Sequence, residues 1–179
     1  MDREHMRAGL RLQDVARWNM VRTIRPQSVM EHSAAVAFIA ARLATKMGLD
    51  PKEAMYWGMM HDIDEATTGD IPSHVKRAVK RAGVDMNEMT NFIAVPPAYR
   101  DIIKIADKME GCVFLREYRH GSHAQWVLCD IDKNFDEAVS RMSEDWQRAV
   151  HSVWAEVTQD IKPDFDFAVS EHPRLAVAK

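Results

Sequence analysis

Residues 59–72 read MMHDIDEATTGDIP, a polar cluster that closes an apolar helical run and then breaks into a turn. His61 and Asp62 diverge by about 100° around a helix. An imidazole nitrogen and a carboxylate oxygen can still bind one ion from adjacent directions, because the two side chains reach different distances from the backbone. Glu65 follows one turn later on the same face. The stretch therefore predicts two metal ligands with a free carboxylate beside them, in preference to a solvated helix end.

The composition predicts one compact domain. Of 179 residues, 46% are apolar and only seven are Gly and seven Pro, which allows a sizeable core. We expect the domain to cover residues 1–161 and a polar tail to cover residues 162–179. The net charge of −3 argues against a stable nucleic-acid partner.

The cysteines and the hydropathy predict the compartment in which the protein is found. Cys112 and Cys129 lack CxxC spacing, which favours buried free thiols in a reducing compartment. We find no signal peptide and no apolar run long enough to cross a bilayer. A cytoplasmic protein without a membrane partner is expected.

Hydrophobic periodicity predicts an all-α fold, a single helical bundle, because no stretch alternates as a strand would. Ser28 and Glu31 form a capping box at the start of one helix, and Gly48 ends that helix. Asp50 and Pro51 begin the next helix. The other expected helices cover residues 2–16, 73–82 and 99–118, with one long or two joined helices after residue 122, whereas residues 17–26 form an irregular connector.

Two further metal ligands follow from helix packing. His32 lies in the first turn of its helix, and consecutive helices joined by a tight turn pack antiparallel, so His32 should meet His61 and Asp62. Asp107 lies on an apolar, core-facing stripe, where a carboxylate is costly unless it is paired or binds a metal. This mixed nitrogen and oxygen set suits one divalent ion such as Zn, Mn, Fe or Co. A structural metal or a buried ion-pair network would have no use for Glu65, which is placed to orient a water or shuttle its proton.

These residues resemble a known family. Glu31-His32, His61-Asp62 and Ala106-Asp107 resemble the H…HD…D signature of the HD-domain metal-dependent phosphohydrolases. Arg17-Trp18 and the block of residues 61–72 resemble the bacterial HD-domain 5′-deoxynucleotidases and the related phage dATP triphosphohydrolases. The similarity covers roughly residues 11–110, and the short span from residue 70 to residue 107 is closer to the phage enzymes.

The resemblance implies a function and roles for individual residues. It implies hydrolysis of a 2′-deoxynucleotide at the α-phosphorus, which releases the deoxynucleoside from a monophosphate or a triphosphate. A divalent metal on His32, His61, Asp62 and Asp107 is implied, with Glu65 as catalytic acid/base beside the catalytic ligand Asp62. A second ion such as Mg²⁺ could accompany a triphosphate.

The implied substrate contacts lie in three segments. Arg17 would bind phosphate, while Trp18 and Asp70 would bound the sugar and exclude a 2′-hydroxyl. Arg22 and Lys76 are candidates for holding a longer phosphate tail. The family also implies a homo-oligomer, for which an apolar interface could use Trp57, Trp126, Trp146 and Trp154.

Two alternatives stay open at this level. An HD-type cyclic-nucleotide or oligonucleotide phosphodiesterase would ask for a second metal and more His ligands, and His74, His120 and His123 lack suitable spacing. A non-catalytic nucleotide-sensing module would have no use for Glu65.

Overall fold

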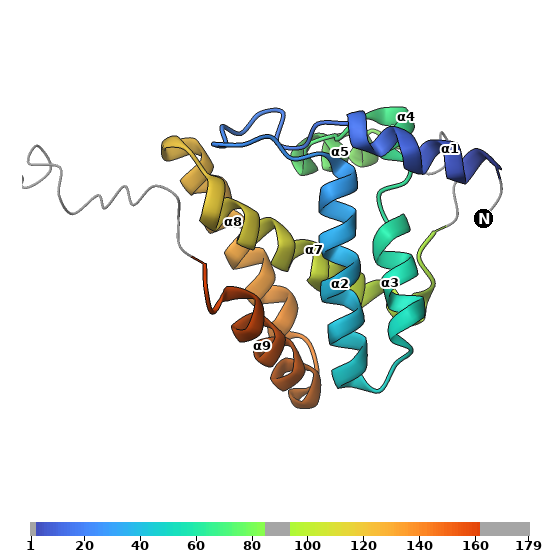
Figure 1. The fold of residues 1–179 in the computed structure, drawn as a ribbon. Coiled ribbons are helices and arrows are strands. Elements are labelled where there is room, and N and C mark those ends of the chain that lie inside the picture. Colours follow the sequence, from blue (N-terminus) through green and yellow to red (C-terminus); the bar gives the residue numbers. More distant parts are fainter. Residues whose placement is uncertain (1–2, 85–93, 162–179) are drawn as a thin grey trace, which may run out of the picture.

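The structure, a computed structural model, describes residues 3–84 and 94–161 (Figure 1). Within these ranges it consists of helices and connecting turns, with isolated backbone bridges and no sheet, which confirms the all-α prediction. None of the described helices is long and apolar enough to cross a membrane. The helices are α1 (Arg3–Arg11), α2 (Val29–Met47), α3 (Pro51–Met60), α4 (Glu65–Thr68), α5 (Ser73–Arg81), α7 (Pro97–Tyr118), α8 (Gly121–Ser140) and α9 (Glu144–Thr158).

Local sequence signals set the bounds of α2 and α3. The Ser28 side chain accepts from the backbone N–H of Glu31, and the Glu31 carboxylate accepts from the backbone N–H of Ser28, both at 3.1 Å. Gly48 ends α2 at a φ of 70°, where glycine is favoured. Asp50 then caps α3 by accepting from the backbone N–H of Lys52.

Helix α2 is the centre of the bundle. It packs antiparallel to α3 and also contacts α7 and α9 (Figure 1). The end of the bundle where α2 begins and α3 ends is covered by α1, α4 and α5. The fully buried side chains of this core include Val36, Leu43, Ile102, Ile105, Met109, Val150 and Val153.

Glycine at position 58 allows α2 and α3 to approach closely. A Cβ atom there would lie 2.6 Å from the Cα and 2.9 Å from the backbone nitrogen of Ala37. Backbone cannot move aside as a flexible side chain can, so the helices would have to separate. The carbonyl of Gly58 also holds the ring of His61, so this contact helps to position the site.

We expect Gly58→Ala to lower the free energy of unfolding by about 1–3 kcal/mol, the range for overpacking a well-filled interior. Gly9→Ala is the matched control, because its Cβ would meet only Ile63 Cδ1 at an ordinary 3.8 Å. Alanine should stabilise α1 there by up to about 1 kcal/mol. Urea unfolding of both variants checks this, and equal stabilities would contradict the close approach.

The structure corrects several expectations about elements. The first helix ends at Arg11 and continues as a 3₁₀ turn, η1 (Leu12–Asp14), and the C-terminal pattern forms two helices, α8 and α9. Residues 61–64 form a turn instead of extending α3. At this break the His61 Nδ1–H donates to the Gly58 carbonyl at 2.7 Å.

One expectation about a side chain is also corrected. Cys112 is buried as predicted, but Cys129 is exposed on α8. Of the tryptophans considered for an apolar interface, Trp57, Trp146 and Trp154 are partly buried against the core, whereas Trp126 is 65% exposed. The expected tail over residues 162–179 lies outside the described residues.

Candidate metal centre and substrate cleft

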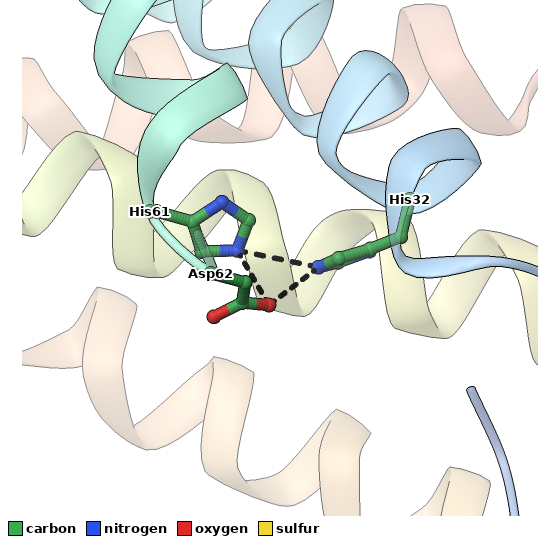
Figure 2. Close-up of side chains that lie close together, drawn as sticks. All are labelled: His32, His61 and Asp62. Carbon is green, nitrogen blue, oxygen red and sulfur yellow. Dashed lines mark hydrogen bonds and ion pairs between the residues drawn. The ribbon is translucent and has the colours of Figure 1, made fainter. Parts of the chain in front are cut away.

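Three helices bring the predicted ligands to one point. His32 comes from the first turn of α2, His61 and Asp62 from the turn that ends α3, and Asp107 from the middle of α7. His61 Nε2 lies 3.3 Å from His32 Nε2 and 3.1 Å from Asp62 Oδ2, and these three side chains point toward one another (Figure 2). His32, His61 and Asp62 form the group in the described chain that could hold a metal ion, and Asp107 Oδ1 lies beside it, 3.3 Å from His32 Nε2.

The hydrogen bonds behind these ligands fix which atoms face the centre. The Nδ1 of His61 lies 2.7 Å from a backbone carbonyl, and the Nδ1 of His32 lies 2.5 Å from Glu110 Oε2. Because carbonyls and ionised carboxylates only accept, both Nδ1 atoms carry a proton, so each ring presents its Nε2 atom to the centre, where Nε2 can bind a cation that takes the place of its proton. Two imidazole nitrogens and two carboxylates so close together suit a cation, so these residues fit a divalent metal.

The charges at the centre shift the pKa values of His32 and Asp107 so that each side chain favours its charged form. Burial lowers the pKa of His32, but Asp107, Asp62 and Glu110 outweigh burial and raise it to about 10. Burial raises the pKa of Asp107, but its hydrogen bond and charge interaction with His32 outweigh burial and lower it to about 2. The centre therefore attracts positive charge strongly.

Glu65 lies next to this centre with one oxygen unused. Its carboxylate is 2% exposed, and Oε1 accepts from Lys76 Nζ at 2.7 Å. In the part of the chain that the structure describes, Oε2 has no hydrogen-bond partner. Burial, followed by the negative charge of Asp62, raises the pKa of Glu65 to about 7. A buried carboxylate with a free oxygen and a raised pKa is typical of an acid/base group.

Arg17 and Trp18 contact residues around the centre. The Arg17 guanidinium donates to Glu110 Oε2 at 3.0 Å, and its Nη2 lies 3.8 Å from Asp107 Oδ1. Trp18 adopts a φ of 62°, which is costly for a bulky residue, and its backbone N–H donates to Asp70 Oδ2 at 3.2 Å. These contacts hold the pair rigidly beside the metal ligands.

A cleft of about 410 Å³ runs past Arg17, Trp18, Glu65 and the carboxylates of the centre. Of the predicted residues, it is lined by Arg17, Trp18, Asp62, Glu65, Asp70, Lys76 and Asp107, while His32 and His61 lie beneath it. Arg22 is exposed and does not line the cleft, so the structure does not bring this residue to the site. His74 and His123 do line the cleft, but no group of potential metal ligands in the described chain includes them.

Sequence reasoning missed two buried residues of the site, Glu110 and Gln27. Glu110 follows Asp107 by one turn on the same core-facing stripe, and that repeat of a carboxylate among apolar residues was a readable signal. Gln27 directly precedes the capping serine and carries no comparable signal. A His–His–Asp group in an all-α bundle, with Asp107 and a buried glutamate beside it, is the arrangement expected of an HD-domain metal-dependent phosphohydrolase.

Comparisons with known proteins identify the family. The model of the YfbR-like 5′-deoxynucleotidases matches residues 5–93. A dATP triphosphohydrolase of Acinetobacter phage SH-Ab 15497 is 35% identical over 173 residues, which cover 82% of this chain and 85% of that relative. The chain therefore belongs to the HD-domain family of deoxynucleotide phosphohydrolases, a family of hydrolytic enzymes, and this confirms the predicted resemblance.

Two further matches describe the range of the family. A 5′-deoxynucleotidase of Vibrio parahaemolyticus is 40% identical over 83 residues, which cover 42% of this chain and 43% of that relative. The solved structure of the cyanophage S-2L HD phosphohydrolase DatZ, bound to dA and one catalytic Zn²⁺ ion, shares the fold. Its TM-score is 0.70 at 21% identity, covering 86% of this chain and 95% of DatZ.

Proposed function

We propose that this chain hydrolyses 2′-deoxynucleotides at the α-phosphorus and releases the deoxynucleoside, with the deoxynucleoside triphosphate as the preferred substrate. The observation that carries the proposal is the group His32, His61 and Asp62 at a cleft that Asp107 and Glu65 also line, with one Glu65 oxygen that has no hydrogen-bond partner in the described chain. The preference for a triphosphate rests on the match to the phage dATP triphosphohydrolase, which extends over most of the chain, whereas the match to the bacterial 5′-deoxynucleotidase stops at less than half.

The metal donors proposed here are His32, His61, Asp62 and Asp107. A divalent ion on these residues, with zinc as the first candidate, would neutralise charge on the phosphoryl oxygens and activate water. The Nδ1 hydrogen bonds of His32 and His61 would leave both Nε2 atoms available to hold it. A second ion such as Mg²⁺ could accompany the triphosphate tail.

The chain's own residues would handle the protons and the phosphate. Glu65 Oε2 would accept a proton from the attacking water, while Lys76 holds the other oxygen of that carboxylate. Arg17 would donate to a non-bridging oxygen of the α-phosphate, since its partly buried guanidinium lines the cleft beside Asp107. Arg77 and Lys108 also line the cleft and would meet the β- and γ-phosphates.

The sugar would lie against Trp18. Two hydrogen bonds hold this residue: its backbone N–H donates to Asp70, and its indole N–H donates to Gln27. A ring fixed in this way leaves no room for a 2′-hydroxyl, and Asp70 could also accept from the 3′-hydroxyl. A ribonucleotide would therefore fit poorly.

A substrate panel tests the proposed function. The purified protein, supplied with Zn²⁺, Co²⁺, Mn²⁺ or Mg²⁺, would be assayed on ribo- and deoxyribonucleoside mono- and triphosphates and on a cyclic nucleotide. We expect turnover of deoxyribonucleotides, fastest for the triphosphates. Turnover of the cyclic nucleotide alone would favour the phosphodiesterase alternative, and binding without turnover would favour the sensing module.

Trp18→Ala tests how the sugar is selected. We expect the wild type to prefer a deoxyribonucleotide over its ribonucleotide by about 10² to 10⁴-fold in kcat/KM, and the variant to narrow this gap mainly by admitting ribose. Trp126→Ala is the control, because this exposed tryptophan lines the cleft from α8, away from Arg17. The deoxynucleotide assignment would be wrong if the wild type used both sugars equally.

Lys76→Met distinguishes two roles of this lysine. Because Lys76 already pairs with Glu65, we expect kcat to fall about 10- to 10²-fold on mono- and triphosphates alike, as the carboxylate loses its orientation. A phosphate-tail role alone would instead raise KM for the triphosphate only. Lys80→Met, an exposed lysine on the same helix outside the cleft, should leave both constants unchanged.

Location and assembly stay predictions. We propose that the chain acts in the cytoplasm as a homo-oligomer without a stable nucleic-acid partner. Both thiols are free, which is consistent with a reducing compartment. Light scattering coupled to gel filtration would determine the oligomeric state.

A further inference from the structure

Glu110 joins the metal ligands to the phosphate-binding side of the cleft. This carboxylate is 5% exposed and does not line the cleft. Its Oε2 accepts from His32 Nδ1 at 2.5 Å and from Arg17 Nη1 at 3.0 Å, while its Oε1 accepts from Gln27 Nε2 at 2.5 Å. One buried carboxylate therefore orients a metal ligand and the phosphate arginine through the same oxygen.

Gln27 continues this chain of hydrogen bonds to the sugar side. It is 3% exposed, and its Oε1 accepts from Trp18 Nε1 at 2.8 Å. A carboxylate only accepts and an indole only donates, so the Gln27 amide can satisfy both neighbours in one orientation alone. The orientation of the Trp18 ring thus depends on an acceptor being present at position 110.

The backbone of Trp18 makes this support necessary. A φ of 62° costs a bulky residue on the order of 1–3 kcal/mol, and such strain persists only where surrounding contacts fix it. Besides Asp70 and Gln27, the indole has Phe114, stacked at 6.0 Å, and the Arg17 guanidinium at 4.9 Å. Of these contacts on the ring, the Gln27 amide is the directional one.

We propose that Glu110 and Gln27 are positioning residues that connect metal retention to sugar selection through the chain His32–Glu110–Gln27–Trp18. Glu110 fixes the tautomer of His32 and the direction of Arg17. Through Gln27 it also fixes the indole that lies against C2′. This inference rests on the proposed function, because it assigns selection of the sugar to Trp18.

Exchanging the two side chains separates positioning from simple charge neutralisation. Glu110→Gln places an amide where His32, Arg17 and Gln27 all donate. If its oxygen stays with His32 and Arg17, its NH₂ group faces Gln27, so one donor must face another donor, either at Gln27 or at the indole. The double variant Glu110→Gln/Gln27→Glu restores the order of donors and acceptors, because the new amide donates to the new carboxylate, which accepts from Trp18 Nε1. The total charge of the pair is unchanged.

Three readouts would be compared for these variants: zinc affinity by competition with a chelating dye, hydrogen exchange of the Trp18 indole N–H by NMR, and the deoxy-to-ribo ratio of kcat/KM. We expect Glu110→Gln to weaken zinc binding about 10- to 10²-fold, the usual effect of losing a partner behind a ligating histidine. Its indole exchange should be faster and its sugar ratio at least about tenfold lower. The double variant should regain indole protection and the sugar ratio but not zinc affinity, because a neutral amide is a weaker acceptor for His32.

Gln27→Leu serves as the second variant, since it removes the link without touching a metal-ligand contact. It should lose indole protection and sugar selection at wild-type zinc affinity. The inference is overturned if Glu110→Gln leaves zinc affinity and indole exchange unchanged. It is also overturned if Gln27→Leu behaves like the wild type while the double variant behaves like Glu110→Gln. A wild type that does not discriminate between sugars would count against the proposed function alone, because zinc affinity and indole exchange would still decide the inference.

Discussion

Asp107→Ala is expected to lose the bound metal and the hydrolysis of deoxynucleotides together. Asp107 is the fourth of the proposed metal ligands, and its 42% exposed side chain lines the cleft, so its removal leaves no buried cavity. We expect metal affinity to fall by more than about 10²-fold, beyond the effect of removing a partner that only orients a ligand. Elemental analysis and turnover of the purified variant measure both losses.

The same helix offers a matched control. Asp101 is an exposed aspartate at the start of α7, outside the cleft, and Asp101→Ala should keep full metal content and wild-type turnover. Thermal unfolding of both variants would show that the helix is intact. Full metal occupancy with normal turnover in Asp107→Ala would remove this residue from the ligand set.

Glu65→Gln is expected to keep the metal and bind nucleotide while kcat falls at least about 10²-fold, the usual scale for losing a general acid/base. The amide would turn its oxygen to Lys76, as Oε1 does now, and would place an NH₂ group where Oε2 is free. That group cannot accept a proton from water. The fold is preserved because glutamine has nearly the same size and shape.

Metal content separates the two roles that a carboxylate could have here. It should equal that of the wild type in Glu65→Gln, in contrast to Asp107→Ala. A variant that lost its metal would make Glu65 a ligand instead. A variant that turned over at the wild-type rate would require another group to accept the proton.

The sequence was informative wherever the signal was local or chemically costly. The capping box at Ser28 and the stop at Gly48 predicted α2 closely, because each depends on contacts within four residues. Asp107 could be found because a carboxylate on a core-facing stripe needs a partner. The convergence with His32 followed from the antiparallel packing of neighbouring helices.

The sequence did not reveal residues that act through contacts with residues far away along the chain. Glu110 meets His32 across 78 positions and Gln27 across 83, so neither contact leaves a pattern in a short window. The pairing of Lys76 with Glu65 was not predicted, because the turn between α4 and α5 that brings the two side chains together leaves no periodic pattern. The break at residues 61–64 is accompanied by a side-chain bond from His61 to Gly58, which helical periodicity cannot reveal.

Hydrolysis of a deoxynucleoside triphosphate in ¹⁸O-labelled water tests the central claim most directly. Attack of water at the α-phosphorus breaks the bond to the 5′-oxygen, so the products should be unlabelled deoxynucleoside and tripolyphosphate that carries the ¹⁸O. Chromatography with mass spectrometry identifies both. Deoxynucleoside monophosphate with pyrophosphate, deoxynucleoside diphosphate with phosphate, or label in the deoxynucleoside would contradict this account of the site.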